Sequence, residues 1–214
     1  MALVAQELSA SRGGKQLFRS LNFRCAPGEC LAIQGPSGSG KTTLLRIVAG
    51  LDDPDHGSVS LKGKLPSEWG WPTYRRSVCF VHQRAVVRDE TVLENLKYPF
   101  TFDISGKQTF DLELATTLLE AVNLGDKGSA QASSLSHGEQ QRMALVRALV
   151  AKPKFILLDE PTSALDAPSR DGMERLLMEQ RDQGLGMLLV THDSEQAGRL
   201  SDRQLSLLSG LAHD

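Results

Sequence analysis

The chain has 214 residues, of which 40% are hydrophobic and 23% are charged, a composition typical of a globular domain. It excludes disordered and fibrous proteins. The formal net charge of −2 provides no basic field for binding along a nucleic-acid backbone, so we expect no nucleic-acid partner.

Membrane spans and disulfides are also not expected. No apolar run approaches the roughly 18 to 20 residues that a transmembrane helix needs, and the start MALVAQELSA does not resemble a secretion signal. We therefore expect a cytoplasmic chain. Cys25, Cys30 and Cys79 are interpreted as free thiols, because no second cysteine pair or histidine cluster completes a metal site.

The first informative stretch predicts a strand, a glycine-rich loop and a helix. An apolar run at residues 30–34 leads into GPSGSGKT, which matches the phosphate-loop pattern GxxxxGK[S/T], and then into a helical pattern. Backbone amides of such a loop face phosphates, Lys41 offers an ammonium, and the Thr42 hydroxyl offers a Mg²⁺ ligand. The predicted nucleotide-binding residues are Gly35, Pro36, Ser37, Gly38, Ser39, Gly40, Lys41, Thr42 and Thr43.

The next segments change character. SVSLKG and SVCFVHQ read as strands, whereas TVLENLKYPF, DLELATTLLEAVNL and GEQQRMALVRALVA have helical periodicity. We predict one domain, with a core of residues 1–83 and 151–214 and an inserted helical lobe of residues 84–150.

After Pro153, strands and helices alternate: KFILLDE, a helix through MERLLMEQRDQG, GMLLVTHD, a helix from Ser194, and a strand near residues 204–208. Such alternation implies right-handed crossovers and a parallel sheet covered on both faces. The predicted fold is α/β: a P-loop NTPase (RecA-like) core with a mainly parallel sheet, an N-terminal antiparallel β portion and an inserted α-helical lobe.

The strand FILLDE ends in two carboxylates, which a buried strand avoids unless its end faces a charged ligand. We predict that Asp159 holds Mg²⁺. Glu160, on the other face of the strand, is then free to accept a proton from the attacking water. A strand that simply runs out into a solvated loop is the alternative, and the nearby phosphate loop argues against it.

Further motifs narrow the class. LSHGEQQ, followed by RMALVRAL and FILLDEPTSALD, closely resembles the signature helix, Walker B strand and D-loop of the ATP-binding cassette (ABC) ATPases. Gln83 resembles their Q-loop glutamine and His192 their switch histidine. Five motifs in family order cover essentially the whole chain.

The resemblance implies that two domains form an ATP-dependent head-to-tail dimer, in which each ATP lies between one phosphate loop and the other domain's signature. This chain's signature residues are Ser136, His137, Gly138 and Glu139, which would contact the partner's ATP. The family usually has glycine where this chain has His137, a bulky and titratable residue. We expect activity to survive, because Ser136 and Gly138 remain, and a pH-sensitive or weakened closed dimer is the hypothesis for His137.

The resemblance assigns the remaining roles one residue at a time. His192 would contact the γ-phosphate and Glu160, Gln83 would approach Mg²⁺ and water, and Asp166 would couple the two sites across the dimer. The family also stacks an aromatic ring on adenine from a loop that has none here. Arg12 is the nearest candidate, and Phe18 is either a substitute or, as alternation favours, a core residue.

The sequence says less about the membrane partner and the transported substrate. A lone cassette fits an ATPase subunit that docks on a separately encoded integral membrane protein, at the cytoplasmic face of the inner (cell) membrane. Residues 91–100 would then form a groove for a partner helix or serve ordinary helix packing. The same segment resembles a subgroup linked to iron or metal-stress export. A lipoprotein-release or macrolide-type exporter, a solute importer, a soluble ABC ATPase in DNA or ribosome work, and a P-loop kinase are the alternatives.

Overall fold

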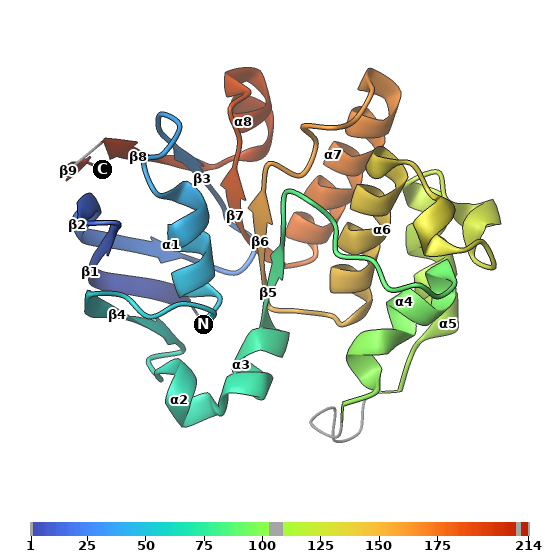
Figure 1. Ribbon diagram of the computed structural model, residues 1–214, viewed down its shortest axis with the longest axis horizontal. Helices are drawn as coiled ribbons and strands as arrows, with labels where there is room; N and C mark the ends of the chain where they lie inside the picture. The colour runs from blue at the N-terminus through green and yellow to red at the C-terminus, as the bar shows by residue number, and fades with distance from the viewer. Residues whose placement is uncertain (1, 103–108, 209–210, 214) are drawn as a thin grey trace. The chain divides into compact units, whose positions relative to one another are not determined.

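A computed structural model describes residues 2–102, 109–208 and 211–213. Its contacts divide the chain into two compact units. The first comprises Met1–Phe80, Lys154–Glu160 and Gln180–Asp214, and the second comprises Val81–Pro153 and Pro161–Glu179. Figure 1 shows the elements of both units in chain order.

A small antiparallel sheet opens the first unit, as predicted. It contains β1 (Leu3–Arg12), β2 (Lys15–Cys25) and β4 (His56–Leu61) in the order β2-β1-β4. Along β2, buried Leu21 and Phe23 alternate with exposed Asn22 and Arg24, because neighbouring side chains of a strand point to opposite faces. One face of this sheet therefore belongs to the core.

The larger sheet has the order β5-β6-β7-β3-β8-β9 and is mainly parallel, as predicted. β3 pairs in parallel with β7 and β8, and β6 pairs in parallel with β7, whereas β9 is antiparallel to β8. The runs CLAI, FILLD and GMLLV are buried throughout, which is typical of parallel strands covered on both faces. The strands are β3 (Cys30–Gln34), β5 (Val78–Val81), β6 (Phe155–Asp159), β7 (Gly186–Val190), β8 (Arg203–Leu208) and β9 (Leu211–His213).

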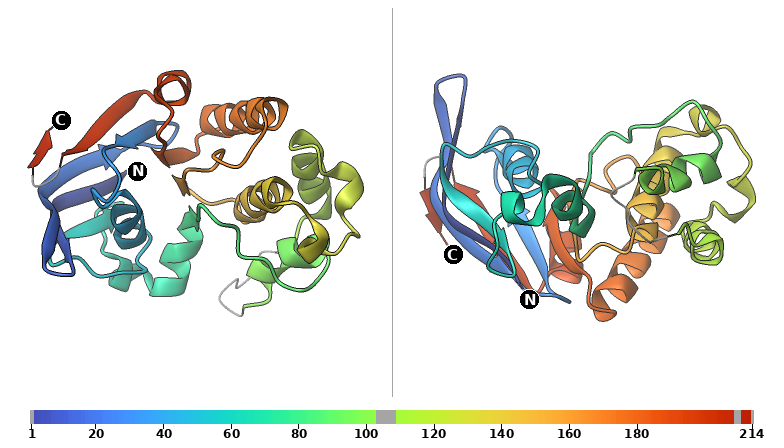
Figure 2. Two further views of the ribbon diagram at one scale, coloured as in Figure 1. Left: turned by 45° about the horizontal axis from the view of Figure 1, so that its top comes forward. Right: turned by 90° about the horizontal axis from the view of Figure 1, so that it is seen from below.

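Helix α1 (Lys41–Val48) lies against strands of both sheets (Figure 2). Its buried Leu44, Leu45 and Val48 belong to the same hydrophobic core as residues of those strands. Helix α8 (Ser194–Leu200) also contacts β3. Two short helices, α2 (Pro66–Trp69) and α3 (Trp71–Ser77), were not predicted. In α3, Tyr74 is fully buried, and its hydroxyl donates a 2.6 Å hydrogen bond to the Val48 carbonyl.

The second unit is helical. Helices α4 and α5 pack on α6. The N-termini of α4 and α6 each have a capping box. The elements are α4 (Val92–Lys97), α5 (Leu112–Ala121), α6 (His137–Val150), α7 (Ala167–Asp182), which ends in the first unit, and the 3₁₀ turns η1 (Tyr98–Phe100), η3 (Gly125–Lys127) and η4 (Ala132–Ser134).

The packing of α4 answers one question that the sequence left open. Val92 and Leu96 are fully buried in the second unit, so these two residues serve helix packing and do not line a surface groove. Among the described residues, no helix is both long and apolar enough to span a membrane.

Candidate nucleotide site

The phosphate loop joins β3 to α1 through backbone conformations that need glycine. Gly40 caps α1 with a left-handed φ of 98°, and a Cβ there would lie 2.8 Å from Leu17 Cβ. A Cβ on Gly35 would lie 2.5 Å from the Leu207 carbonyl oxygen. Strands β2 and β8 therefore hold the loop from outside, and no side chain fits at either glycine.

Lys41 closes the loop on itself. Its side chain is nearly buried, and Nζ donates to the carbonyls of Gly35 at 2.8 Å and Pro36 at 3.0 Å. Burial lowers the pKa of Lys41, and the carboxylates of Glu160 and Asp159 partly oppose that shift. The hydroxyl of Ser39 is buried without a hydrogen-bond partner among the described residues. An ammonium and an unpaired hydroxyl in a glycine loop suit phosphate oxygens, which accept from both.

Thr42 and Asp159 form the oxygen-rich corner of the site. Thr42 Oγ1, in the first turn of α1, donates a 2.7 Å hydrogen bond to Asp159 Oδ2 at the end of β6. Asp159 is only 4% exposed. One hydroxyl and one carboxylate fit Mg²⁺, which usually takes few protein ligands and completes its shell with water and substrate phosphates. Within the described residues, no cluster of three or more His, Cys, Asp or Glu offers an all-protein metal cage.

Glu160 and His192 form the second polar pair. Glu160 has a left-handed φ of 49°, uncommon for a residue with a side chain, and its amide donates to the Val190 carbonyl at 2.9 Å. Its Oε1 lies 2.7 Å from His192 Nε2, and the His192 side chain is 53% exposed. The strained turn thus directs the Glu160 carboxylate to His192, the second residue after β7, whereas Asp159 faces Thr42.

In the second unit, the signature residues form the start of α6. Ser136 Oγ accepts from the Glu139 amide at 3.3 Å, and Glu139 Oε2 accepts from the Ser136 amide at 2.8 Å. The hydrogen bond from the Ser136 backbone, helped by its side chain, lowers the pKa of Glu139. Ser136 and His137 are exposed, whereas a Cβ on Gly138 would lie 3.0 Å from Leu165 Cδ2. The glycine that this chain keeps therefore lies in tight packing against Leu165, whereas His137 has room for its side chain at the surface.

Asp166 has a local role that sequence reasoning missed. Its carboxylate accepts from the Ser169 amide at 3.2 Å at the start of α7, and the hydrogen bonds to Ser169 lower its pKa. An Asp directly before a helix is a common N-cap, and that signal was available in the sequence. Gln83 lies in the second unit, two residues after β5, and is exposed.

The adenine candidates separate clearly. Phe18 is fully buried in the core, as alternation indicated, so it is not available to stack on a base. Arg12 is exposed at the end of β1, opposite Lys15. The hydrogen bond from Arg46 lowers the pKa of Asp52, and the charge of Arg12 makes the smallest contribution to that shift. Cys25 and Cys30 are free and buried, and burial raises the pKa of each thiol to about 12.

A glycine loop with a buried lysine, a hydroxyl paired with a strand-end aspartate, and an adjacent glutamate define a P-loop nucleotide-hydrolysing domain. The sequence model described as "ABC transporter" matches residues 18–163. The chain belongs to this family, and it is the ATPase of an ABC transporter.

Individual relatives agree with the family assignment. The chain is 39% identical to a phosphate import ATP-binding protein of Natronomonas pharaonis, over 97% of this chain and 77% of that protein. It is also 39% identical to an Fe(3+) ions import ATP-binding protein of Rhodococcus jostii, over 98% of this chain but 60% of that protein.

A solved structure described as the ATP binding subunit of an ABC transporter superposes with a TM-score of 0.89 at 26% identity, covering 100% of this chain and 89% of the other. The predicted fold class and ATPase activity are therefore confirmed.

Proposed function

We propose that the chain binds ATP with Mg²⁺, dimerises around two ATP molecules, and uses hydrolysis to drive an integral membrane partner. The observation that carries this proposal is the arrangement at the carboxyl ends of β3, β6 and β7. There, Lys41, the Thr42–Asp159 pair and the Glu160–His192 pair all belong to the first unit.

Residues of the phosphate loop would bind the phosphates, with Lys41 transferring its hydrogen bonds from the loop carbonyls to phosphate oxygens. Thr42 and Asp159 would hold Mg²⁺, with Gln83 as a further ligand. When bound, Mg²⁺ neutralises charge on the β- and γ-phosphates. Arg12 would lie over the base, and the remaining loop residues, Pro36, Ser37, Gly38 and Thr43, would contact the nucleotide.

Glu160 is proposed as the general base. Its carboxylate takes a proton from water as the water oxygen bonds to the γ-phosphorus and the bond to the ADP oxygen breaks. His192 donates to Glu160 across 2.7 Å, which fixes the carboxylate, and its exposed face would contact the γ-phosphate.

The signature would act in trans. Ser136 and the amides at the start of α6 would bind the γ-phosphate held by a second copy, because a helix N-terminus presents free N–H groups and positive dipole. His137 and Glu139 flank that contact, and Asp166 would couple the two sites. A homodimer then completes each site.

We propose that the chain docks on an integral membrane partner at the cytoplasmic face of the cell membrane. The relatives named above are import proteins, for phosphate and for Fe(3+) ions, which favours import. Metal export, suggested by the segment TVLENLKYP, is the second candidate. Copurification of the membrane partner, followed by transport of radiolabelled phosphate or iron into or out of vesicles, separates the two.

The proposal is tested with Glu160→Gln, which keeps the side-chain shape and removes the base. We expect the variant to bind ATP, to lose hydrolysis by about 10²- to 10³-fold, and to accumulate as an ATP-bound dimer in light scattering. Glu179→Gln, on the exposed surface of α7, is the matched control. A Glu160→Gln chain that stays monomeric with ATP and Mg²⁺ and hydrolyses normally would contradict the proposal.

A further inference from the structure

The segment between β5 and α4 is fastened to α6, although it has no regular secondary structure of its own. We call residues 82–90 the tethered segment. It includes Gln83 and the exposed Val86, and it lies wholly in the second unit. Three side chains, those of Gln141, Asn95 and Arg147, hold its backbone.

Gln141 holds the beginning of the tethered segment. It lies on α6, five residues after Ser136, and is only 3% exposed. Its Nε2 donates a 2.9 Å hydrogen bond to the carbonyl of His82, the residue immediately before Gln83. The signature helix is thereby bonded to the residue next to the predicted Q-loop glutamine.

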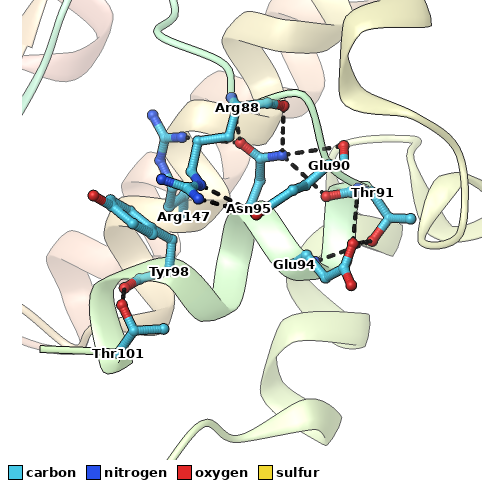
Figure 3. A network of polar contacts seen from close by, with 8 residues as sticks. All are labelled: Arg88, Glu90, Thr91, Glu94, Asn95, Tyr98, Thr101 and Arg147. Carbon is cyan, nitrogen blue, oxygen red and sulfur yellow. Dashed lines mark hydrogen bonds and ion pairs between the residues drawn. The ribbon is translucent and has the colours of Figure 1, made fainter.

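Asn95 holds the end of the segment, as Figure 3 shows. This α4 residue is fully buried, and its Oδ1 accepts from the Arg88 amide at 2.9 Å. Its Nδ2 lies 3.1, 3.3 and 3.0 Å from the carbonyls of Arg88, Glu90 and Thr91. A buried amide with its donors and acceptor engaged fixes a loop strongly, because breaking any bond leaves a polar group unpaired.

Arg147 connects that loop to α6. Its NH2 donates to the Val86 carbonyl at 2.8 Å, and its NH1 lies 3.4 Å from Asn95 Oδ1. Arg88, within the segment, forms a two-point ion pair with Glu90 and stacks 4.1 Å from the Tyr98 ring centre (Figure 3). The contacts of Arg88 therefore hold the tethered segment in a fixed shape next to the Arg147 guanidinium.

The tethered segment is also joined to the stretch that precedes the signature. The Ala132 amide donates to the Glu90 carbonyl at 2.9 Å, and Ser133 Oγ donates to Asp89 at 3.1 Å. Gln140 on α6 donates to the carbonyls of Ala132 and Leu135. The segment, the pre-signature turn and α6 thus form one hydrogen-bonded body.

We propose that Gln141, Asn95 and Arg147 are positioning residues that make the tethered segment and the signature move together. A push on the exposed part of the segment, or engagement of Gln83 at a nucleotide, would then displace Ser136 with it. The inference rests on the proposed function, because it assigns a use to the signature in hydrolysis. None of the three side chains needs to touch ATP.

The test compares Gln141→Met and Arg147→Met, which keep side-chain length but remove the donors. Gln183→Met, just after α7, and Arg175→Met, on α7, change exposed side chains and are matched controls. Amide hydrogen exchange is followed at residues 84–91, where the Arg88 amide reports on its bond to Asn95 Oδ1, with α5 as the internal reference. We expect faster exchange at 84–91 in the two test variants, with α5 and the controls unchanged.

The catalytic readout is the split between kcat and KM for ATP in the purified chain. We expect kcat to fall about tenfold while KM changes less than about twofold, because the phosphate loop is untouched. Arg147→Lys, which keeps a donor, should recover part of kcat. A merely structural role would instead lower the melting temperature and speed exchange in α5 as well.

Two outcomes would overturn the inference while the proposed function stands. The first is wild-type kcat in the test variants despite faster exchange at 84–91, and the second is unchanged exchange at 84–91. A wild-type chain that neither binds nor hydrolyses ATP would overturn the proposed function itself, and this inference with it. The unmodified chain, measured first, distinguishes these cases.

Discussion

The two units prepare their functional residues in different ways. In the first unit the polar side chains already touch one another: Lys41 bonds the loop carbonyls, Thr42 bonds Asp159, and Glu160 bonds His192. In the second unit Ser136 and His137 are exposed, and only their capping is complete. The first unit thus holds its polar side chains in place around a glycine loop, whereas the second leaves the start of α6 exposed, as the proposed contact with a second copy requires.

The largest expected effect comes from a substitution in the nucleotide site of the first unit. Lys41→Ala removes the ammonium from the loop, and we expect ATP hydrolysis to fall by about 10²- to 10³-fold because a charged donor to the transferring phosphoryl group is lost. Steady-state ATPase assays measure the loss, and equilibrium binding of a fluorescent ATP analogue should weaken with it. Lys154→Ala, on the exposed surface, is the control. Hydrolysis within twofold of wild type would contradict the site.

A mixing experiment sharpens the comparison. Ser136→Glu places a negative charge where the partner's γ-phosphate is expected, so this variant should also lose most hydrolysis. If the two units act on different nucleotides, a heterodimer of inactive Lys41→Ala and inactive Ser136→Glu chains has one intact site of two. Because about half of the dimers in an equal mixture are heterodimers, the mixture should have roughly a quarter of wild-type activity. Mixtures that stay as inactive as their components would exclude action in trans.

A smaller effect concerns the base. Arg12→Tyr offers a ring at the tip of the β1–β2 hairpin, and we expect it to strengthen ATP binding about 3- to 10-fold, because stacking of a ring on adenine adds to burial. Isothermal titration with ATP and GTP measures the gain. Arg24→Tyr, toward the other end of β2, should change neither affinity. No gain in Arg12→Tyr would remove Arg12 from the base site.

The smallest effect is a pH dependence of the signature cap. Since folding lowers the pKa of Glu139, its capping contribution is present above the ordinary carboxyl value of 4.5 and is lost as pH falls through the lowered folded-state pKa. The group is only half-buried and its partner Ser136 is exposed, so we expect a few tenths of a kcal/mol, about 1 °C in melting temperature. Glu139→Gln should have a smaller acid-induced loss than wild type, measured by circular dichroism at neutral and acidic pH. Equal losses would contradict the assignment.

The sequence determined the elements that carry local chemistry. A strand, a glycine loop and a helix are recognisable at residues 30–48 because phosphate binding constrains spacing, and FILLD reads as a buried strand because it has no polar residue before Asp159. The Ser136–Glu139 box was likewise visible as a spacing of three. Each of these signals lies within a few neighbouring residues.

Only the tertiary structure decided which distant groups meet. Gln141 bonds a carbonyl 59 residues away and Arg147 bonds one 61 residues away, and a backbone carbonyl leaves no mark in a sequence because every residue has one. The left-handed turn at Glu160 and its pairing with His192 depend on how β6 and β7 lie side by side. The choice between Phe18 and Arg12 as the residue near adenine also depended on burial, because the neighbours that pack on a strand decide which of its faces is covered.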